Sequence, residues 1–270
     1  MKRNICTMAA ALLFLGLLVG CSARQDQVET TSPTVTVPVE IPEETVPETT
    51  EQEVVPTETA VPEHSQLYIP GLSVEDVILY FNEVCLDAEY YSVGDPSVLQ
   101  KWGAPISYGI QGGPTEEDLR VLSEFAQWLN TIEGFPGMKE VGQIHEAALQ
   151  IYFCDAEEMK RRMGDSFVNM DGAVTFWYDG NNEIYDAIIC CRTDLSQELR
   201  SSVILEEIYN GLGPVQDTLL RQDSIISADY AQPEHLTEID ELILKLLYHP
   251  DMLCGMTARE CEAVIRQLYW

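Results

Sequence analysis

The stretch ILEEIYNGLG, residues 204–213, places two carboxylates and an amide on a predicted helix. Glu206 and Glu207 are adjacent, and Asn210 follows about one turn later, so the three side chains share one side of the helix. Such groups can serve as general acid and base, or can bind a cation or a donor-rich ligand. We therefore predict a binding cleft formed by Glu206, Glu207, Asn210 and the downstream Asp217, with Glu207 as the candidate catalytic residue.

The helix that carries these residues is expected to span about residues 196–211. A helical wheel places the apolar side chains of the motif in one arc and the two glutamates and Asn210 in the opposite arc. On that evidence alone, the helix is amphipathic and the glutamates lie on a solvated face. Leu199 and Val203, however, project onto the arc of the glutamates. This pattern favours a buried or cleft-lining helix, in which we expect burial of Leu199, Val203, Ile204, Leu205 and Ile208.

Burial changes the chemistry of adjacent carboxylates. Two of them in a half-buried cleft repel each other, so one should keep its proton or find a cation or a strong donor. The glutamates are therefore candidate site residues, with the solvated face as the alternative.

Residues 1–20 have the features of a signal peptide. Lys2 and Arg3 form a short positively charged N-terminal region. The apolar region MAAALLFLGLLVG that follows is too short to span a membrane comfortably. The ending LVGC resembles a bacterial lipobox, which implies cleavage before Cys21 and a diacylglycerol on its sulfur. We expect a lipid-anchored protein at the extracytoplasmic face of the membrane; the alternative is an uncleaved signal anchor.

Residues 21–66 are expected to combine the lipidated Cys21 with a disordered linker rich in Pro, Glu and Thr. Isolated valines beside prolines form no apolar face, so this segment cannot offset its ordering entropy. Residues 67–270 are expected to form the globular domain. The formal net charge of the chain is −30, which disfavours nucleic acid as a partner, because phosphate contacts dominate that binding.

The globular part reads as an α+β domain with a mixed sheet. Helical spacing is found after Ser73 and after Thr115, in a short segment after residue 155, around the glutamates, and in two C-terminal segments. Residues 104–113 and 147–154 read as strands, and the turn residues 179–182 predict a hairpin. Helices and strands alternate in the first part of this domain, and only helices follow at its C-terminal end.

Six cysteines belong to this domain, and their pairing stays open between disulfides and buried free thiols. An extracytoplasmic location permits up to three bridges. Cys190 and Cys191 are adjacent on a predicted strand, so at most one is expected to face inward. The six are Cys85, Cys154, Cys190, Cys191, Cys254 and Cys261.

The motif EEIYN-GLG is similar to the zinc-peptidase helix H-E-x-x-H followed by Leu-Gly. Glu206 and Asn210 stand at the two histidine positions, and Glu207 stands at the general base. The downstream stretch SIISADYAQPEHLTEIDELILKLLY looks like the metzincin segment after the Met-turn, with Ile226 in place of the methionine.

Residues 72–270 resemble an uncharacterised bacterial family, catalogued as domain of unknown function 2927, of which many members are lipoproteins. The segments KWGAPISYGIQG, LQIYF, EEIYNGLGPVQD, DSII and LLYHPDMLCGM carry the resemblance. It implies a zincin-like fold, with a twisted mixed sheet, an edge strand lining a cleft, a central active-site-type helix and C-terminal helices.

The expected function follows from how the motif departs from zinc peptidases. Glu206, Asn210 and Gln216 offer oxygen atoms where zinc prefers imidazole or thiolate, a set that suits a hard ion such as calcium or magnesium, or no metal at all. We expect no metal and no cofactor beyond the diacylglycerol on Cys21. The sequence then favours a non-catalytic cell-surface binding module for a peptide or cell-wall ligand. The alternative is a hydrolase, peptidase or cell-wall-acting, that uses Glu206 and Glu207 without histidine ligands.

Overall fold

A computed structural model gives the architecture of the domain. It describes residues 4–8, 65–86, 97–228, 233 and 235–270. The predicted lipidation site Cys21 and the predicted linker up to residue 64 lie outside the described residues, so both stay predictions. In the described part, none of the helices has the length and apolarity that crossing a membrane requires.

Each predicted helix is present. The α-helices are α1 Val74–Leu86, α2 Glu116–Leu129, α3 Ala156–Met163, α4 Gln197–Gly211, α5 Glu238–Leu247 and α6 Ala258–Leu268. Two short 3-10 turns are η1 Ile144–Glu146 and η2 Asp165–Phe167. Polar side chains fix the helix starts, since Thr115, Thr237 and Thr257 each form a reciprocal capping box with the acidic residue three positions on.

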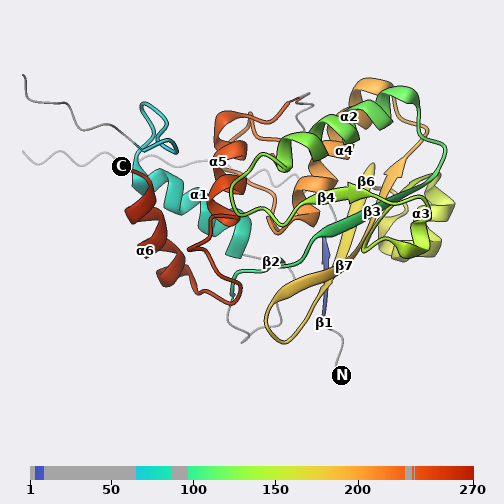
Figure 1. Cartoon of the computed structure of the whole chain (residues 1–270). Helices are drawn as coiled ribbons and strands as arrows, with labels where there is room; N and C mark the ends of the chain where they lie inside the picture. The colour runs from blue at the N-terminus through green and yellow to red at the C-terminus, as the bar shows by residue number, and fades with distance from the viewer. Residues whose placement is uncertain (1–3, 9–64, 87–96, 229–232, 234) are drawn as a thin grey trace, which may run out of the picture. The chain divides into compact units, whose positions relative to one another are not determined.

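The strands form one mixed sheet of seven strands (Figure 1). They are β1 Asn4–Met8, β2 Lys101–Trp102, β3 Ile106–Gly112, β4 Met138–Glu140, β5 Leu149–Cys154, β6 Gly172–Tyr178 and β7 Glu183–Arg192. The order is β1-β6-β7-β5-β3-β4, with β2 paired to β7. Strands β7, β5, β3 and β4 run parallel, whereas β6 is antiparallel to β7 and β1 is antiparallel to β6.

Helices cover both faces of the β6–β7 part of the sheet. Helix α4 packs on β6 and β7 and is itself covered by α2, as Figure 1 shows. On the other face, Met159 of α3 packs with Ala173 and Cys190 in a second, smaller apolar cluster. Cys191 belongs to the main core. The expectation that only one of Cys190 and Cys191 faces inward is therefore wrong, because this sheet has two buried faces.

The six cysteines of residues 67–270 are free thiols, and all except Cys254 are buried. The predicted hairpin is confirmed between β6 and β7, where Asn182 has a φ of 62°. The sequence did not predict the short strands β2 and β4. It also assigned residues 4–8 to the signal peptide, and here they form β1 at the edge of the sheet.

Candidate functional site

Helix α4 holds the predicted site at the centre of the domain. It begins after Ser196, whose hydroxyl accepts a hydrogen bond from the Leu199 amide at 3.4 Å. It ends before Gly213, whose φ of 131° turns the chain away. Between these points the helix contacts β6 and β7 on one side and α2 on another, so most of its circumference is covered.

The burial predicted for α4 is confirmed at four of five positions. Val203, Ile204, Leu205 and Ile208 are buried, whereas Leu199 is only partly buried. The side of the helix that carries the glutamates is buried too. Glu207 is 2 % exposed and Glu206 is partly buried. The alternative of a solvated face is therefore wrong for Glu207.

Burial of Glu207 depends on the first residue of β6. A Cβ atom on Gly172 would lie 2.5 Å from Cγ1 of Val203, a distance that real contacts do not show. Glycine therefore allows α4 to approach the strand at this point. Neither Gly172 nor the preceding Asp171 was predicted as a site residue. The available signal was an Asp-Gly pair directly before a β-rich run.

Burial raises the pKa of Glu206 to about 8, and the charges of Asp217 and Asp171 add to the effect. Burial also raises the pKa of Glu207 well above its usual range, with Glu206 and Asp217 as further causes. The structure thus brings Asp217 close enough to act on both predicted glutamates, and adds Asp171 as a fourth acid. Burial thus favours the neutral, protonated form of Glu207 over its carboxylate.

The described residues provide no cation for these glutamates. None of them forms an ion pair or hydrogen bond with the carboxyl of Glu206 or Glu207. The nearest arginine on α4, Arg200, instead pairs with Asp118 of α2, and both side chains are buried. Gln197 also donates to Asp118, at 2.7 Å. The buried positive charge therefore joins α4 to α2 and leaves the glutamates uncompensated.

Asn210 adds an unsatisfied acceptor on the same side of the helix. Its side chain is 2 % exposed, and its Oδ1 atom accepts no hydrogen bond within the described part of the chain. An orphaned buried acceptor costs about 1–3 kcal/mol, so a donor from water or from a ligand would stabilise the domain at this point. Glu206, Glu207 and Asn210 together present a proton donor, a titratable carboxyl and an acceptor.

Gln216 was the third residue expected to offer an oxygen atom where a zinc peptidase has a metal ligand. It is partly buried, and its backbone amide donates a hydrogen bond to the carbonyl oxygen of Val84 at 3.2 Å. Among the described residues, no group of three or more His, Cys, Asp or Glu side chains could hold a metal ion. That the domain works without metal stays a prediction.

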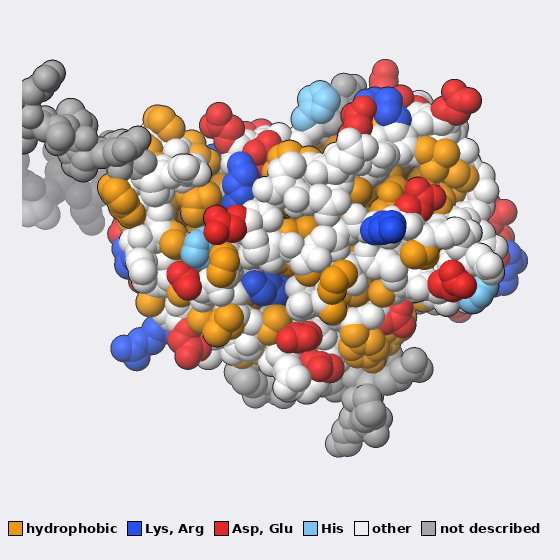
Figure 2. Space-filling view, viewed as in Figure 1, with side chains coloured by type: hydrophobic (Ala, Val, Ile, Leu, Met, Phe, Trp, Pro, Cys, Tyr) orange, Lys and Arg blue, Asp and Glu red, His pale blue; other side chains and the backbone are white. Residues whose placement is uncertain are grey.

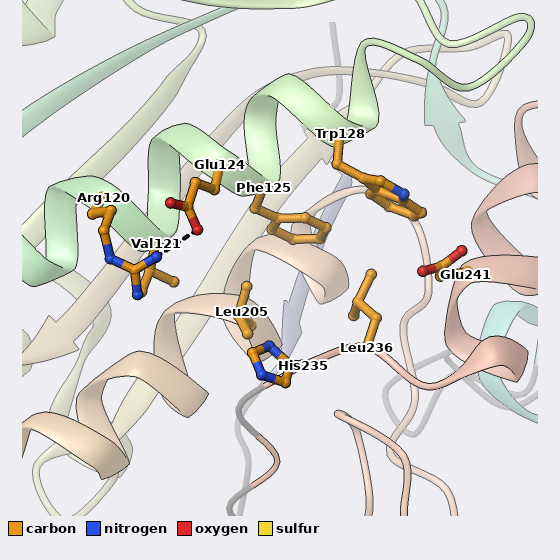
Figure 3. A pocket seen from close by; sticks show the side chains of 9 residues that line it. All are labelled: Arg120, Val121, Glu124, Phe125, Trp128, Leu205, His235, Leu236 and Glu241. Carbon is orange, nitrogen blue, oxygen red and sulfur yellow. Dashed lines mark hydrogen bonds and ion pairs between the residues drawn. The ribbon is translucent and has the colours of Figure 1, made fainter.

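A separate pocket of about 230 Å³ lies between α2, α4 and the start of α5 (Figure 3). Phe125, Trp128, Leu205 and Leu236 form its apolar walls, and Arg120 at one side is paired with Glu124. The sequence did not predict this pocket, because its walls come from α2, α4, α5 and the segment that precedes α5. It has no side chain in common with the acidic site on α4.

Charged side chains are dispersed over the surface. On the face shown in Figure 2, the few Lys and Arg side chains are scattered among acidic ones and form no continuous basic patch. The expectation that nucleic acid is not a partner stays a prediction.

Comparison with known proteins defines a family and no activity. No curated protein matches this chain. The model of one family, described as proteins of unknown function (DUF2927), matches residues 75–267, which include every described helix from α1 to α6 except the first residue of α1 and the last of α6. The chain therefore belongs to the DUF2927 family of proteins of unknown function.

Proposed function

We propose that this protein is a lipoprotein, anchored through Cys21 at the extracytoplasmic face of the membrane, whose domain is a non-catalytic binding module. Its ligand is a peptide or a cell-wall fragment that carries amino or amide groups. It binds at Glu206, Glu207, Asn210 and Asp217. The proposal includes a zincin-like origin for the fold, with α4 in the place of the active-site helix.

One observation carries the proposal: Glu207 is a buried carboxyl with no cationic partner among the described residues. A core that needed only to fold would be better served by an apolar side chain, because burying an uncompensated polar group is costly. Binding of an amine or amide donor would compensate both Glu207 and the Oδ1 atom of Asn210.

The zincin-like part rests on residue correspondence and topology. Glu206, Glu207 and Asn210 occupy the three positions of the H-E-x-x-H motif, and the helix that bears them packs under a mixed sheet with an antiparallel β6. Without imidazole ligands, Glu207 has no metal-bound water to activate. This argument favours binding over hydrolysis.

The experiment is a screen of short synthetic peptides and soluble cell-wall peptides against three proteins. They are the wild type, the double variant Glu206→Gln/Glu207→Gln, and Glu198→Gln as the matched control. Glu198 lies on the same helix but is exposed. We expect peptides with a free amine to bind the wild type and Glu198→Gln alike. The double variant should bind at least about tenfold more weakly, a difference of 1.4 kcal/mol.

Mass spectrometry of the same mixtures tests the alternative. Cleavage of a peptide or glycan that is lost in Glu207→Gln would make the protein a hydrolase and overturn the binding-only proposal. Binding that is equal in all three proteins would show that the acidic site does not hold the ligand.

A further inference from the structure

We propose that Cys154 and Cys190 form a thiol–disulfide exchange site, in which Cys154 attacks an accessible disulfide bond and Cys190 resolves the mixed disulfide. The two cysteines lie on the face of the sheet opposite to α4. This activity is therefore separate from the proposed binding function and does not depend on it.

The register of β5 and β7 brings the two thiols together. Cys190 on β7 lies opposite Tyr152 on the parallel strand β5. Cys154 follows Tyr152 by two residues, so its side chain points to the same face of the sheet. Both cysteines belong to the smaller apolar cluster with Met159 of α3, whereas Cys191 belongs to the main core. Cys154 and Cys190 are thus diagonal neighbours on one face.

Cys154 differs in acidity from the other five thiols of the domain. Interaction with the Cys190 thiol lowers the pKa of Cys154, and the Arg162 guanidinium acts in the same direction. Burial and the carboxylates of Glu158 and Asp155 oppose this effect but do not outweigh it. The pKa of each of the other five thiols is raised. Because the thiolate is the nucleophile in disulfide exchange, Cys154 is the attacking thiol.

Two contacts hold Arg162 of α3 close to this thiol. The central carbon of its guanidinium lies 3.5 Å from the centroid of the Tyr152 ring. Its Nη2 atom lies 2.6 Å from Oε1 of Glu158. Tyr152 belongs to the same cluster as the two cysteines, so the positive charge stays beside them. A fixed cation next to a cysteine favours the thiolate form.

The two thiols differ in access from solvent. Cys154 is 8 % exposed and Cys190 is fully buried. Helix α3 begins two residues after Cys154, and Met159 is its one buried residue. A helix of two turns with a single buried side chain opens more readily than the strands beneath it. An incoming disulfide therefore reaches Cys154 first, and Cys190 lies behind it.

The reaction proceeds in two exchanges. The Cys154 thiolate attacks one sulfur of the incoming disulfide, an S–S bond forms between them, and the second sulfur leaves as a thiol after it takes up a proton. Cys190 then loses its proton and attacks Sγ of Cys154, and the first sulfur leaves as a thiol. The two cysteines are oxidised to one disulfide, and the incoming disulfide is reduced to two thiols.

The geometry of the pair favours a reversible bond. Diagonal neighbours on adjacent strands lie about 7–8 Å apart, whereas the Cα atoms of a relaxed disulfide lie at most about 6.8 Å apart. A bond between Cys154 and Cys190 therefore requires β5 and β7 to shift, and the resulting strain makes it easier to reduce. Such a pair can pass its disulfide on to another dithiol.

The test uses the full chain, purified in detergent and reduced, with glutathione disulfide as the probe. Remaining thiols are alkylated, and peptides are mapped by mass spectrometry. We expect the wild type to form the Cys154–Cys190 disulfide and to retain little glutathione. Cys190→Ala should accumulate glutathione on Cys154, at least about tenfold more than the wild type. Cys154→Ala should leave Cys190 unmodified, and Cys191→Ala, altered on the opposite face, should behave like the wild type.

The role of Arg162 is tested by the pH dependence of Cys154 alkylation. Arg162→Gln should raise the pH at which Cys154 reacts and should slow its alkylation at pH 7 at least about threefold, because less thiolate is present. Arg161→Gln is the matched control, since Arg161 also pairs with Glu158 but is 67 % exposed. Equal pH profiles in the wild type and Arg162→Gln would contradict the role of this cation.

The mapping of the wild type decides the proposal even if a variant fails to fold. A disulfide between other cysteines, or no disulfide at all, would overturn it. So would a folded Cys190→Ala protein that carries no glutathione on Cys154. A Cys154–Cys190 bond that stays intact in excess reduced glutathione would show a structural disulfide instead of an exchange site.

Discussion

The carboxyl of Glu207 on α4 lies directly against Gly172 at the start of β6, where a Cβ atom would be 2.6 Å from Oε1. This contact joins the predicted site helix to the edge of the sheet. It buries a carboxyl for which the described residues supply no cation. The stability of the domain and the chemistry of the site therefore depend on the same few atoms.

Gly172→Ala is expected to destabilise the domain by about 1–3 kcal/mol, the usual cost of overpacking a core. The new methyl group would clash with Val203 and Glu207, and neither can move far, because α4 is held by β6, β7 and α2. The measurement is urea unfolding followed by circular dichroism. Gly180→Ala in the hairpin turn is the control, since a Cβ there meets no atom within 4 Å. Equal effects of the two changes would contradict the close contact.

The stability of the domain should depend on pH through Glu206. Its folded pKa of about 8 lies above its ordinary value of 4.5, so the folded state holds a proton that the unfolded state has released. The contribution of Glu206 to the free energy of unfolding therefore falls as pH rises from about 4.5 to 8. Glu207, whose pKa is also raised, acts in the same direction.

Urea titrations at intervals between pH 5 and pH 8 test this dependence. Glu206→Gln should show a smaller loss of stability over this range than the wild type, and the exposed Glu198→Gln should match the wild type. If the wild type and Glu206→Gln change in parallel, Glu206 is not held protonated in the folded state.

Arg200→Ala is expected to cost about 3–5 kcal/mol, as is usual when one partner of a buried pair is removed. It would leave the Asp118 carboxylate buried at 0 % exposure. Arg221→Ala provides the control, because Arg221 pairs with Asp223 at 2.9 Å on the surface, where a pair contributes at most about 1 kcal/mol. The two are compared by thermal unfolding. Similar losses of stability in the two variants would show that the buried pair between α2 and α4 contributes no more than a surface pair.

The purified protein is expected to contain no stoichiometric zinc, and chelators should leave its melting temperature unchanged. Carboxylate and amide oxygens at Glu206, Asn210 and Gln216 bind zinc poorly compared with imidazole and thiolate. Metal content is measured by mass spectrometry on protein purified without added metal. One zinc per chain, lost together with activity in Glu206→Ala, would make this domain a metallohydrolase.

Cys21→Ala is expected to release the protein from the membrane fraction or to leave an unprocessed precursor, because the lipid attaches to that sulfur. The test is fractionation with intact mass measurement, and Cys85→Ala, a buried thiol of the domain, is the control. A Cys21→Ala chain that is still processed and membrane-bound would contradict the lipobox prediction.

Local signals were sufficient for most elements of the domain. Thr115, followed by acidic first-turn residues, indicated the start of α2, and turn residues 179–182 indicated the β6–β7 hairpin. Leu199 and Val203, which project onto the same side of the helix as Glu206 and Glu207, indicated that this helix is buried. Most residues of α4 are buried in the structure. These patterns act over a few residues, so one sequence is enough to read them.

The short strands were not predictable in this way. β2 has two residues and β4 has three, too few for any period to show. Each forms because a longer neighbouring strand provides a backbone to pair with, β7 for β2 and β3 for β4. Pairing between distant segments carries no local sequence signal.

The sequence by itself determined which side chains lie together on α4, because residues three and four apart share a side of any helix. It therefore identified Glu206, Glu207 and Asn210 as a group. Only the tertiary structure decided that Arg200 pairs with Asp118, that Asp171 joins the acids, and that Glu207 rests on Gly172. These relationships connect segments up to 82 residues apart, and they follow from how α2, α4 and β6 pack, which no local pattern encodes.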